Sequence, residues 1–592
     1  MKTLKTSFRT HTNGQLRISD KDQSVKLSGW VNTRRDHGGI IFIDLRDRYG
    51  LTQIVFDPKH NEKAFAAGDS LRREDVISIE GVVKPRGEGL VNPNLDTGEI
   101  EVFVDSVTIH AKSDVPPIEI DDRKPATDDV RMEYRYLDLR RPTMQKNLKF
   151  RSNVIQTART FMQGMGFTDI DTPILVKSTP EGARDYVVPS RVNPGKFYAL
   201  PQSPQLYKQI LMISGCDRYY QIAKCLRDED LRADRQPEHT QIDFEMSFVT
   251  QEDIRGMVED LFVMVFKENL DIELKKPFPI FSYTEAMEKY GSDKPDIRYD
   301  LFLTDVSEIV VESDFGVFKD VVDAGGIVKC INPPKNLGRK EIDGYITFCQ
   351  ENGAKGMAWM RYGENGLESN IAKYFPEDVK KKLVEAVKPS KDSVLMFIAD
   401  AQENTNFILD KLRRKLASDL ELYDPKDFKF CWVNDFRLFA YNEDEGRWEP
   451  EHHMFSMPKA EYIETMEAEP GRVLGDLWDI TLNGVELGSG SIRISNPEVQ
   501  RKVMNIIGMT DAEAEEKFGF LLKAYKYGGP VHGGMGLGLD RTVALMLGYQ
   551  DIREVIAFPK NKNAQCPMDG SPSAIDEKQL KELHIDIKGK KS

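Results

Sequence analysis

The sequence predicts a multidomain α+β protein that begins with a small β-barrel and carries an inserted α/β domain. Five short apolar segments with strand-like patterns occupy residues 24–110, where turn residues separate them. Helical and strand-like patterns alternate over the remaining chain. At 592 residues with 40% hydrophobic composition, the chain is also too long for a single core and is expected to form several domains.

The charge and cysteine content exclude several classes of protein. The 96 acidic residues exceed the 82 basic ones, and the net charge of −14 argues against general binding of nucleic acid through bulk charge. No apolar run approaches the roughly 20 residues that span a membrane, and the first residues lack the apolar stretch of a signal peptide. The six cysteines form no C-x-x-C pair, which favours neither a zinc site nor a disulfide framework. We therefore expect a cytoplasmic protein with no membrane partner.

Residues 1–111 are predicted to form the barrel. A helical stretch at 61–73 lies between the third and fourth strands, which is the order of an oligonucleotide-binding (OB) barrel. Strand counting alone favours a generic β-barrel. This segment holds 16 basic and 16 acidic residues, so it contributes nothing to the net negative charge. The predicted strands are 25–31, 40–45, 51–56, 76–80 and 100–104.

The remaining chain divides where its composition changes. Residues 112–148 combine prolines with charged residues and are interpreted as a hinge. A helix over 149–164 and a strand over 167–175 are predicted next. Residues 288–430 alternate strands with lysine-rich helices and carry no recognisable chemistry, so they are interpreted as an inserted domain, and residues 566–592 as a polar C-terminal extension. The elements predicted in the insertion are the strands 326–331 and 394–398 and the helices 378–387 and 406–422.

Two glycine-rich segments carry an arginine where a dinucleotide-binding motif has its third glycine. Gly488-Ser-Gly490 is followed by Arg493, and Gly536-Leu-Gly538 by Arg541. An arginine there prevents close packing of helix on strand, but its forked donors can bind an anion. Taken singly, each motif is more typical of a glycine turn followed by a surface arginine. The phosphate loop G-x-x-x-x-G-K-[ST], H-E-x-x-H and G-x-S-x-G are absent from the sequence.

A charged loop that begins at Arg227 joins two predicted strands within residues 219–245. On the second strand, Ile242 and Phe244 alternate with Asp243 and Glu245. Such a polar row, joined to an arginine-rich loop, is costly to bury unless it binds a ligand. A hairpin with a solvated polar face is the alternative.

Together these segments resemble the three sequence motifs of class II aminoacyl-tRNA synthetases. The motifs correspond to the helix and strand that end at Pro173, to the strand–loop–strand around Arg227, and to the segment 536–541. The chain is more closely similar to the bacterial-type aspartyl-tRNA synthetases of subclass IIb, over essentially its whole length. The closer resemblance is carried by Pro180-Glu-Gly-Ala-Arg-Asp185, Leu200-Pro-Gln-Ser-Pro-Gln-Leu-Tyr-Lys208, Asp243-Phe-Glu245, His452-His453 and Asn483-Gly-Val-Glu-Leu-Gly-Ser-Gly-Ser-Ile-Arg493.

The resemblance implies both a domain organisation and a reaction. A catalytic domain on an antiparallel sheet flanked by helices is expected in two parts, residues 149–287 with the first two motifs and residues 431–565 with the third. The insertion at 288–430 would be GAD-like. The implied reaction activates aspartate with ATP to aspartyl-adenylate and transfers it to the 3′ end of the aspartate tRNA. Joining a carboxylate to a phosphate requires that two anions be neutralised and held in line, which arginines and a divalent metal can do.

The same resemblance implies a nucleotide site. Arg227 would bridge the amino-acid carboxylate and the α-phosphate, Arg541 would bind the γ-phosphate side, and Glu486 completes the implied catalytic set. Asp479 and Glu486 are the implied Mg²⁺ ligands, because they are hard oxygen donors suited to a phosphate-bound ion. His239 stands where the family has a phenylalanine, and its ring can still stack on adenine. The implied ATP-binding residues are Arg227, Asp228, Glu229, Gln236, His239, Glu486, Gly538, Leu539, Asp540 and Arg541.

A cation-lined pocket for the side chain of aspartate is implied as well. Lys208 and Arg493 would face the side-chain carboxylate and reject the isosteric asparagine, whose amide would place donors against donors. Glu181, Gln205 and Asp243 are candidate acceptors for the amino group. Taken one at a time, each of these residues is more typical of a surface ion pair. The implied aspartate-binding residues are Glu181, Gln205, Lys208, Arg227, Asp243, His452, His453 and Arg493.

The barrel is implied to read the anticodon of the tRNA by stacking and by polar contacts to base edges. Phe42 fits the barrel core equally well. His37 and Gly89 resemble the pairing in family members that also charge the asparagine tRNA, which leaves open whether this chain charges one tRNA or two. The implied anticodon contacts are Arg35, Phe42, Gln53 and Glu101.

The resemblance further implies a homodimer, formed through the segment that ends at Pro173. Two alternatives stay open at this point. One is an asparagine-specific or lysine-specific relative of the same subclass. The other is a tRNA-binding or regulatory paralogue without catalysis, against which the intact Arg227, Glu486, Arg493 and Arg541 argue.

Overall fold

The computed structural model describes residues 5–124, 126–179, 182–229 and 235–588. The chain divides into two compact units, Met1–Lys149 with Ala557–Ser573 and Phe150–Ile556 with Ala574–Ser592. Each unit contains hydrophobic clusters of its own. None of the helices that the structure describes combines the length and the apolar character needed to cross a membrane.

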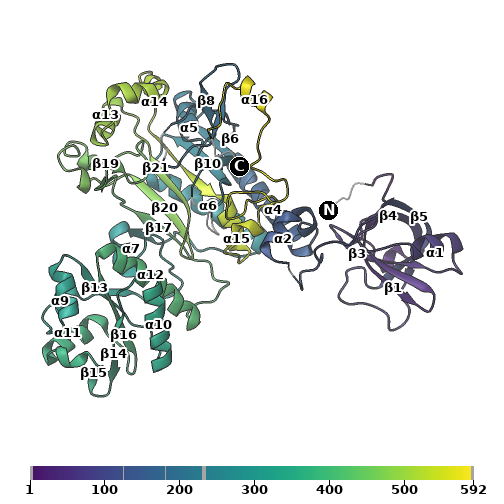
Figure 1. The fold of residues 1–592 in the computed structure, drawn as a ribbon, viewed down its shortest axis with the longest axis horizontal. Coiled ribbons are helices and arrows are strands. Elements are labelled where there is room, and N and C mark those ends of the chain that lie inside the picture. Colours follow the sequence, from purple (N-terminus) through teal and green to yellow (C-terminus); the bar gives the residue numbers. More distant parts are fainter. Residues whose placement is uncertain (1–4, 125, 180–181, 230–234, 589–592) are drawn as a thin grey trace. The chain divides into compact units, whose positions relative to one another are not determined.

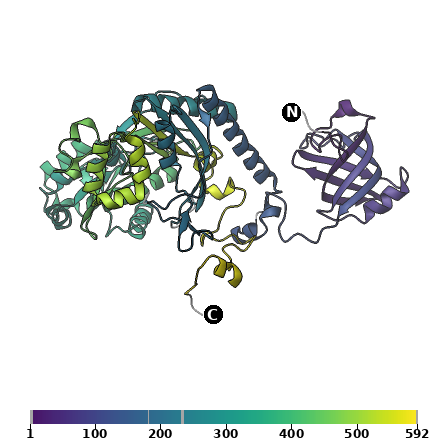
Figure 2. The same cartoon turned by 90° about the horizontal axis from the view of Figure 1, so that it is seen from above.

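The first unit contains a closed barrel with the strand order β1-β2-β3-β5-β4. Neighbouring strands are antiparallel except β3 and β5, which are parallel. Figure 2 shows the strands wrapped around one core, in which Leu27, Ile43 and Ile54 are fully buried. The helix between the third and fourth strands confirms the predicted OB order. The elements are β1 (Ser24–His37), β2 (Ile40–Asp47), β3 (Gly50–Phe56), α1 (Glu62–Asp69), β4 (Val76–Pro85) and β5 (Ile100–Ala111), preceded by the short helix η1 (Ile18–Asp20).

Two short helices, α2 (Asp128–Glu133) and α3 (Arg135–Asp138), follow the barrel in the predicted hinge. They are joined by the buried Asp138, which forms ion pairs with Arg131, Arg135 and Arg141. The next helix, α4 (Pro142–Gly164), begins earlier than the predicted start at residue 149. Proline suits the first position of a helix because its missing N–H has no partner there in any case.

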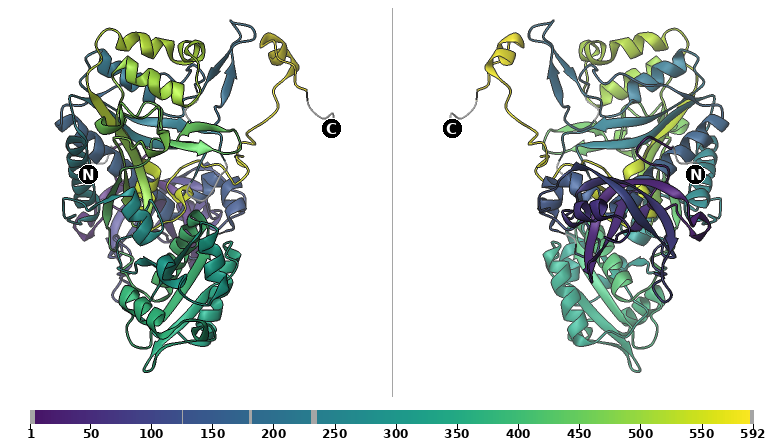
Figure 3. Two further views of the ribbon diagram at one scale, coloured as in Figure 1. Left: turned by 90° about the vertical axis from the view of Figure 1, so that its left-hand side faces the viewer. Right: turned by 90° about the vertical axis from the view of Figure 1, so that its right-hand side faces the viewer.

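The second unit is built on an eight-stranded sheet of order β11-β17-β20-β21-β22-β10-β9-β6. Its inner pairs are antiparallel, as predicted, whereas the edge pairs β11–β17 and β6–β9 are parallel. Figure 3 shows early blue strands and late green and yellow strands within this sheet. Its strands are β6 (Thr168–Asp169), β9 (Arg218–Leu226), β10 (Glu238–Ser247), β11 (Ile280–Ser282), β17 (Phe430–Asn434), β20 (Leu477–Leu482), β21 (Val485–Ile492) and β22 (His532–Gly538).

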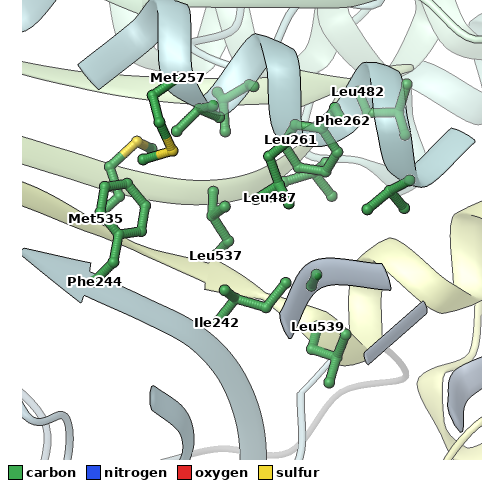
Figure 4. Packing of buried hydrophobic residues seen from close by; sticks show 14 of the residues in the cluster. Ile242, Phe244, Met257, Leu261, Phe262, Leu482, Leu487, Met535, Leu537 and Leu539 are labelled. Atoms are coloured by element: carbon green, nitrogen blue, oxygen red, sulfur yellow. The ribbon is translucent and has the colours of Figure 1, made fainter. Parts of the chain in front are cut away.

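Helix α6 (Gln251–Leu270) covers one face of this sheet. Figure 4 shows its Leu261 and Phe262 packed among side chains of the sheet such as Leu487 and Leu537. Ile242 and Phe244 of β10 join this core, which confirms the predicted alternation along the strand. The polar residues of β10 therefore point to the opposite face.

The edge strand β6 covers only two residues of the segment 167–175 for which a strand was predicted. Its pairing with β9 continues as far as the hydrogen bond from the Ile170 amide to the Tyr220 carbonyl, 3.1 Å long. Pro173 has no amide hydrogen with which to extend a ladder. The other elements of this unit outside the insertion are β7 (Val187–Pro189), β8 (Phe197–Ala199), α5 (Gln205–Ile213), α7 (Tyr283–Tyr290), β18 (Phe439–Asn442), β19 (Arg447–Pro450), η3 (Ala460–Tyr462), η4 (Pro470–Arg472), α13 (Pro497–Ile506), α14 (Asp511–Tyr525), α15 (Leu539–Met546), η5 (Ile552–Glu554) and α16 (Glu577–Glu582).

The inserted segment forms its own antiparallel sheet of order β12-β13-β16-β14-β15, with helices on both faces (Figure 1). Ile331 and Met396 pack with α10 and α12 on one face, and Cys330 and Phe397 pack with α9 and α11 on the other. Burial of both faces explains the continuous apolar runs of β13 and β16. The elements are β12 (Leu303–Asp305), α8 (Ser307–Val310), α9 (Gly316–Asp323), β13 (Ile327–Ile331), α10 (Arg339–Glu351), β14 (Ala358–Gly363), β15 (Gly366–Glu368), η2 (Ala372–Tyr374), α11 (Glu377–Val387), β16 (Val394–Asp400) and α12 (Gln402–Asp419).

Candidate active site

A cavity of about 410 Å³ opens on the polar face of the large sheet. Strands β10, β21 and β22 supply its floor, the first turn of α5 one wall, and the loop that follows β9 another. Of the residues predicted to bind aspartate or ATP, the following line it: Gln205, Lys208, Arg227, Glu229, Gln236, His239, Asp243, His452, His453, Glu486, Arg493, Gly538, Asp540 and Arg541.

Two buried cations and two buried carboxylates meet at one end of this cavity. Nζ of Lys208 lies 2.8 Å from Oδ2 of Asp243 and 3.3 Å from Oε2 of Glu245. Nε of Arg493 donates to Oε1 of Glu245 at 2.9 Å. Burial alone would raise the pKa of Glu245, but Arg493 and Lys208 outweigh it and lower the pKa to about 2. Glu245 is therefore a fixed negative charge that orients both cations.

Polar atoms at this end are left for a ligand. Oδ1 of Asp243 and Nε2 of Gln205 are buried and have no hydrogen-bond partner within the part of the chain that the structure describes. Burial raises the pKa of Asp243. An unpaired buried acceptor costs free energy, so the pair is suited to a substrate that brings a donor for Asp243 and an acceptor for Gln205.

His453 presents a donor at the same end. The Phe455 amide donates to Nδ1 of His453 at 3.2 Å, so the proton of the neutral ring is on Nε2. Nε2 is buried and unpaired among the described residues. Burial, with Arg493 and Lys208 nearby, lowers the pKa of His453 to about 3 and keeps the ring neutral. The ring of His452 stands edge-on to Phe436 at a centroid distance of 4.7 Å.

The other end of the cavity carries Arg227, Arg541 and a neutral imidazole. Arg227 directly follows β9, and its Nε is buried with no hydrogen bond to a described residue. Arg541, in the first turn of α15, donates to the Glu486 carbonyl at 3.1 Å. Burial and the two arginines lower the pKa of His239 to about 3. A neutral ring that lines the same cavity as two guanidinium groups is suited to stacking against a flat, uncharged base.

Gly536 keeps the floor of the cavity open. A Cβ on Gly536 would lie 2.7 Å from the amide oxygen of Gln241 on the paired strand. Any side chain there would displace Gln241 and fill the cavity.

Asp479 and Glu486 stand on the adjacent strands β20 and β21. Burial and the neighbouring Glu486 raise the pKa of Asp479 well above its usual value. Burial would also raise the pKa of Glu486, but Lys294 and Arg541 outweigh it and lower the pKa. Oδ1 of Asp479 has no hydrogen-bond partner among the described residues. No group of three or more His, Cys, Asp or Glu side chains that could hold a metal occurs in the described ranges.

Two residues predicted to bind ATP stand apart from the cavity, one predicted residue lies outside the described residues, and the carboxylate of another is already bonded. Glu181 falls outside the described residues. Asp228 and Leu539 are not part of the lining, and Leu539 packs into the core beneath α6. Asp540 lines the cavity, but its Oδ2 accepts from the Thr240 amide at 2.7 Å and its Oδ1 pairs with Arg151 of α4.

Sequence reasoning assigned no role to Glu245 or Lys294. Glu245 lies in the same polar row as Asp243, so the alternation along β10 was a usable signal. Lys294 Nζ lies 3.1 Å from Oε2 of Glu486, in a segment that carries no motif. No local pattern could have identified it.

In the barrel, three of the predicted anticodon residues form one polar network. Nη2 of Arg35 lies 3.3 Å from Oε1 of Gln53, and Nε2 of Gln53 donates to Oε2 of Glu101 at 2.8 Å. Phe42 pairs with Arg35 across β1 and β2, is half-buried, and stands outside the barrel's buried cluster. His37 contacts the Phe42 ring edge-on at 6.1 Å. Gly89, with a φ of +75°, lies in the exposed loop between β4 and β5.

Two family profiles match the chain. The profile described as tRNA synthetases class II (D, K and N) matches residues 127–562, and that of the OB-fold nucleic acid binding domain matches residues 25–109. Solved structures share the fold, including the following two. An asparaginyl-tRNA synthetase from Pyrococcus horikoshii complexed with asparaginyl-adenylate has a TM-score of 0.57 at 19% identity, over 91% of this chain and 95% of that one. A putative aspartyl-tRNA synthetase from Leishmania major has a TM-score of 0.59 at 17% identity, over 95% and 96%.

Curated relatives are similar over nearly their whole length. An aspartate–tRNA(Asp/Asn) ligase of Desulfatibacillum aliphaticivorans is 49% identical over 583 residues, which are 98% of each chain. An aspartate–tRNA ligase of Bacillus licheniformis is 49% identical over 586 residues, 98% of this chain and 99% of that protein. These matches confirm the resemblance found in the sequence: the chain belongs to the class II tRNA synthetases of the D, K and N group.

Proposed function

We propose that the protein is an aspartate–tRNA ligase that activates L-aspartate with ATP to aspartyl-adenylate and transfers the aspartyl group to the 3′ end of the aspartate tRNA. The observation that carries the proposal is the cluster of Lys208 and Arg493 around Glu245, next to the unpaired Oδ1 of Asp243. The two cations can bind the side-chain carboxylate of aspartate, and the unpaired oxygen of Asp243 can accept a hydrogen bond from its ammonium group. The names of the relatives at 49% identity support the same substrate.

The two ends of the cavity divide the work of the first step. Lys208 and Arg493 bind the side-chain carboxylate, and Asp243 accepts from the amino group. Gln205, through its side-chain oxygen, and Glu181, which lies outside the described residues, are assigned the amino group too. Arg227, which lies in the same cavity, neutralises the reacting carboxylate and the α-phosphate. Little proton transfer by the protein is needed, because positioning and charge neutralisation carry the step.

ATP is assigned to the end with Arg541 and His239. Asp479 and Glu486 fit a Mg²⁺ ion, since Mg²⁺ is typically held by one or two carboxylates together with phosphate oxygens and water. The unpaired Oδ1 of Asp479 is the observation that favours this assignment. When bound, the ion would neutralise charge on the phosphates of ATP. Asp228 and Leu539, which stand apart from the lining, are assigned to ATP by the family pattern alone.

Pyrophosphate exchange tests this function. Exchange of labelled pyrophosphate into ATP is expected with aspartate and at least about a hundredfold more weakly with asparagine or lysine. Exchange with asparagine or lysine in place of aspartate would establish the relative of different specificity. Arg227→Ala is expected to lower exchange by about 10²- to 10³-fold without loss of the fold. If the wild type shows no exchange, the non-catalytic paralogue is the correct interpretation.

The barrel is proposed to bind the anticodon through Arg35, Phe42, Gln53 and Glu101. The exposed Arg35 and the half-buried Phe42 are available to bases, which favours a binding role for Phe42 over a core role. The names of several relatives include both tRNA(Asp) and tRNA(Asn), and we propose that this chain charges both. Side-by-side charging of the two purified tRNAs tests this point; charging of tRNA(Asp) alone removes the role proposed for His37 and Gly89.

A homodimer in the cytoplasm completes the proposal. Ile174 and Leu175, directly after Pro173, are 47% and 51% exposed. The next residue, Val176, pairs with Ala199 of β8, where Phe197 is also exposed. An exposed apolar strip of this kind is typical of a subunit interface. None of the six cysteines, all of which lie in the described part of the chain, forms a disulfide, which suits a reducing compartment.

A further inference from the structure

Lys294 brings a third charged group to the carboxylates Asp479 and Glu486. It lies in the segment between α7 and β12 that leads into the inserted domain, and its Nζ is 3.1 Å from Oε2 of Glu486. Its own neighbour Asp293 is less close, at 3.7 Å. The activation step described above makes no use of this cation.

Arg414 of α12 holds the main chain on both sides of this ion pair. Its Nη2 donates to the Lys294 carbonyl at 3.0 Å, and its Nη1 donates to the Gly484 carbonyl at 2.8 Å. Gly484 belongs to the turn between β20 and β21, shortly before Glu486. Nε of Arg414 donates to Asp410 on the same helix, which sets the orientation of the guanidinium group. Because the guanidinium group is planar and its orientation is set, its two hydrogen bonds fix the distance between the segment that carries Lys294 and the turn that carries Gly484.

The surroundings are shaped for this contact. Gly484 has a φ of +81°, and a Cβ there would lie 2.6 Å from Nη1 of Arg414. The adjacent Arg413 is fully buried and donates to the carbonyls of Asp296 at 2.9 Å and Leu301 at 2.6 Å. Helix α12 thus anchors the whole segment that carries Lys294. The inserted domain is connected to the metal carboxylates through two consecutive arginines.

We propose that Lys294 is the resident counter-ion of the Asp479–Glu486 carboxylate pair and that the inserted domain keeps it in place through Arg414. This role rests on the proposed function, which assigns Mg²⁺ to the same carboxylates. Asp479 is buried and the side chain of Glu486 is 26% exposed, and two neighbouring carboxylates so poorly solvated are unfavourable without a cation. Because the Lys294 ammonium already neutralises negative charge at these carboxylates, a divalent ion gains little binding free energy there before the nucleotide arrives. Arg414 acts through Lys294 and is a positioning residue.

Mn²⁺ binding to the full-length protein without nucleotide tests this role. The electron paramagnetic resonance signal of free Mn²⁺ gives the concentration of the free ion. The bound fraction is the difference from the total Mn²⁺ added. The wild type is expected to bind weakly, and Lys294→Met is expected to bind at least about tenfold more tightly, because a charge pair at this distance is lost. Lys294→Arg, which keeps the charge, should resemble the wild type. Lys415→Met, on the surface of the same helix, removes one positive charge away from the pair and should change nothing.

The part played by Arg414 is tested by a double variant. Arg414→Ala is expected to tighten Mn²⁺ binding by less than Lys294→Met does, and the two changes together by no more than Lys294→Met alone. Additive effects would overturn the role of Arg414. Adding Glu486→Gln to Lys294→Met should abolish the gain, which places the new binding at this pair.

The failure of this inference and the failure of the proposed function give different results. Unchanged Mn²⁺ affinity in Lys294→Met, with wild-type unfolding, would overturn the counter-ion role. Aspartate-dependent pyrophosphate exchange by the same wild-type preparation tests the proposed function separately. Aspartate-dependent pyrophosphate exchange by the wild type, together with unchanged Mn²⁺ binding in Lys294→Met, would therefore reject the counter-ion role of Lys294 but leave the proposed function standing.

Discussion

Glu245 binds Arg493 through two hydrogen bonds, 2.9 Å long from Nε and 3.3 Å long from Nη2. The side chain of Glu245 is fully buried and that of Arg493 is 5% exposed. Lys208 approaches the same carboxylate at 3.3 Å. One buried carboxylate therefore sets the position of both cations that are proposed to bind the side chain of aspartate.

Replacement of Glu245 by glutamine tests this arrangement. Glu245→Gln keeps the size of the side chain but removes the charge, so Arg493 and Lys208 lose their common partner. We expect KM for aspartate in pyrophosphate exchange to rise by about 10- to 100-fold, with a smaller change in kcat. Glu252→Gln, at an exposed carboxylate that pairs with the buried Arg255, is the matched control. An unchanged KM would show that the two cations are held by other contacts.

The same carboxylate predicts a pH dependence of stability. The pKa of Glu245 is about 2 in the folded protein, below its usual value of 4.5. Its contribution is therefore fully present above pH 4.5 and is lost as the pH falls towards about 2, and the difference corresponds to about 3 kcal/mol of unfolding free energy. Urea unfolding at pH 6 and pH 3 should show the advantage of the wild type over Glu245→Gln shrinking with acid. An advantage that stays constant would contradict the lowered pKa.

The polar network in the barrel predicts that a change there weakens tRNA charging but leaves the activation of aspartate intact. Gln53 connects Arg35 to Glu101, so Gln53→Ala disturbs all three side chains. We expect kcat/KM for tRNA charging to fall by about 10- to 100-fold, because a lost base contact costs about 1–3 kcal/mol. Pyrophosphate exchange needs no tRNA and should stay unchanged. Glu62→Gln on α1 serves as the control, and equal loss in both assays would point to misfolding instead.

The exposed strip after Pro173 predicts the oligomeric state. Leu175→Asp places a charge in the proposed interface and is expected to convert the dimer to a monomer. Light scattering at working concentration measures this change. Val317→Asp, at an exposed valine of α9 in the inserted domain, should leave the mass unchanged. A wild type that is already monomeric would reject the dimer.

The barrel and the alternation along β10 followed from local sequence patterns, the catalytic fold and most of the site residues followed from the resemblance to class II aminoacyl-tRNA synthetases, and the remainder depended on distant contacts. The alternation of Ile242 and Phe244 with Asp243 is visible within a few residues, so β10 and its polar face were predicted. Glu245 meets Arg493 across a separation of 248 residues, and Arg414 meets Lys294 across 120. The spacing of residues within a short stretch of sequence does not indicate such long-range contacts. The early start of α4 at Pro142 was missed for a different reason, because prolines among charged residues also suit a linker.

Strand β10 completes its pairing only with a very late part of the chain. Its partners are β9, which directly precedes it, and β22, and the hydrogen bond from Thr240 to Asp540 spans 300 residues. During synthesis on a ribosome, β10 therefore has one open edge until β22 (His532–Gly538) has emerged. The barrel and the inserted domain contain all their own strand partners and can fold long before that moment. The cavity is consequently among the last parts of the molecule to form, and a truncated chain carries two finished domains without a binding site between its strands.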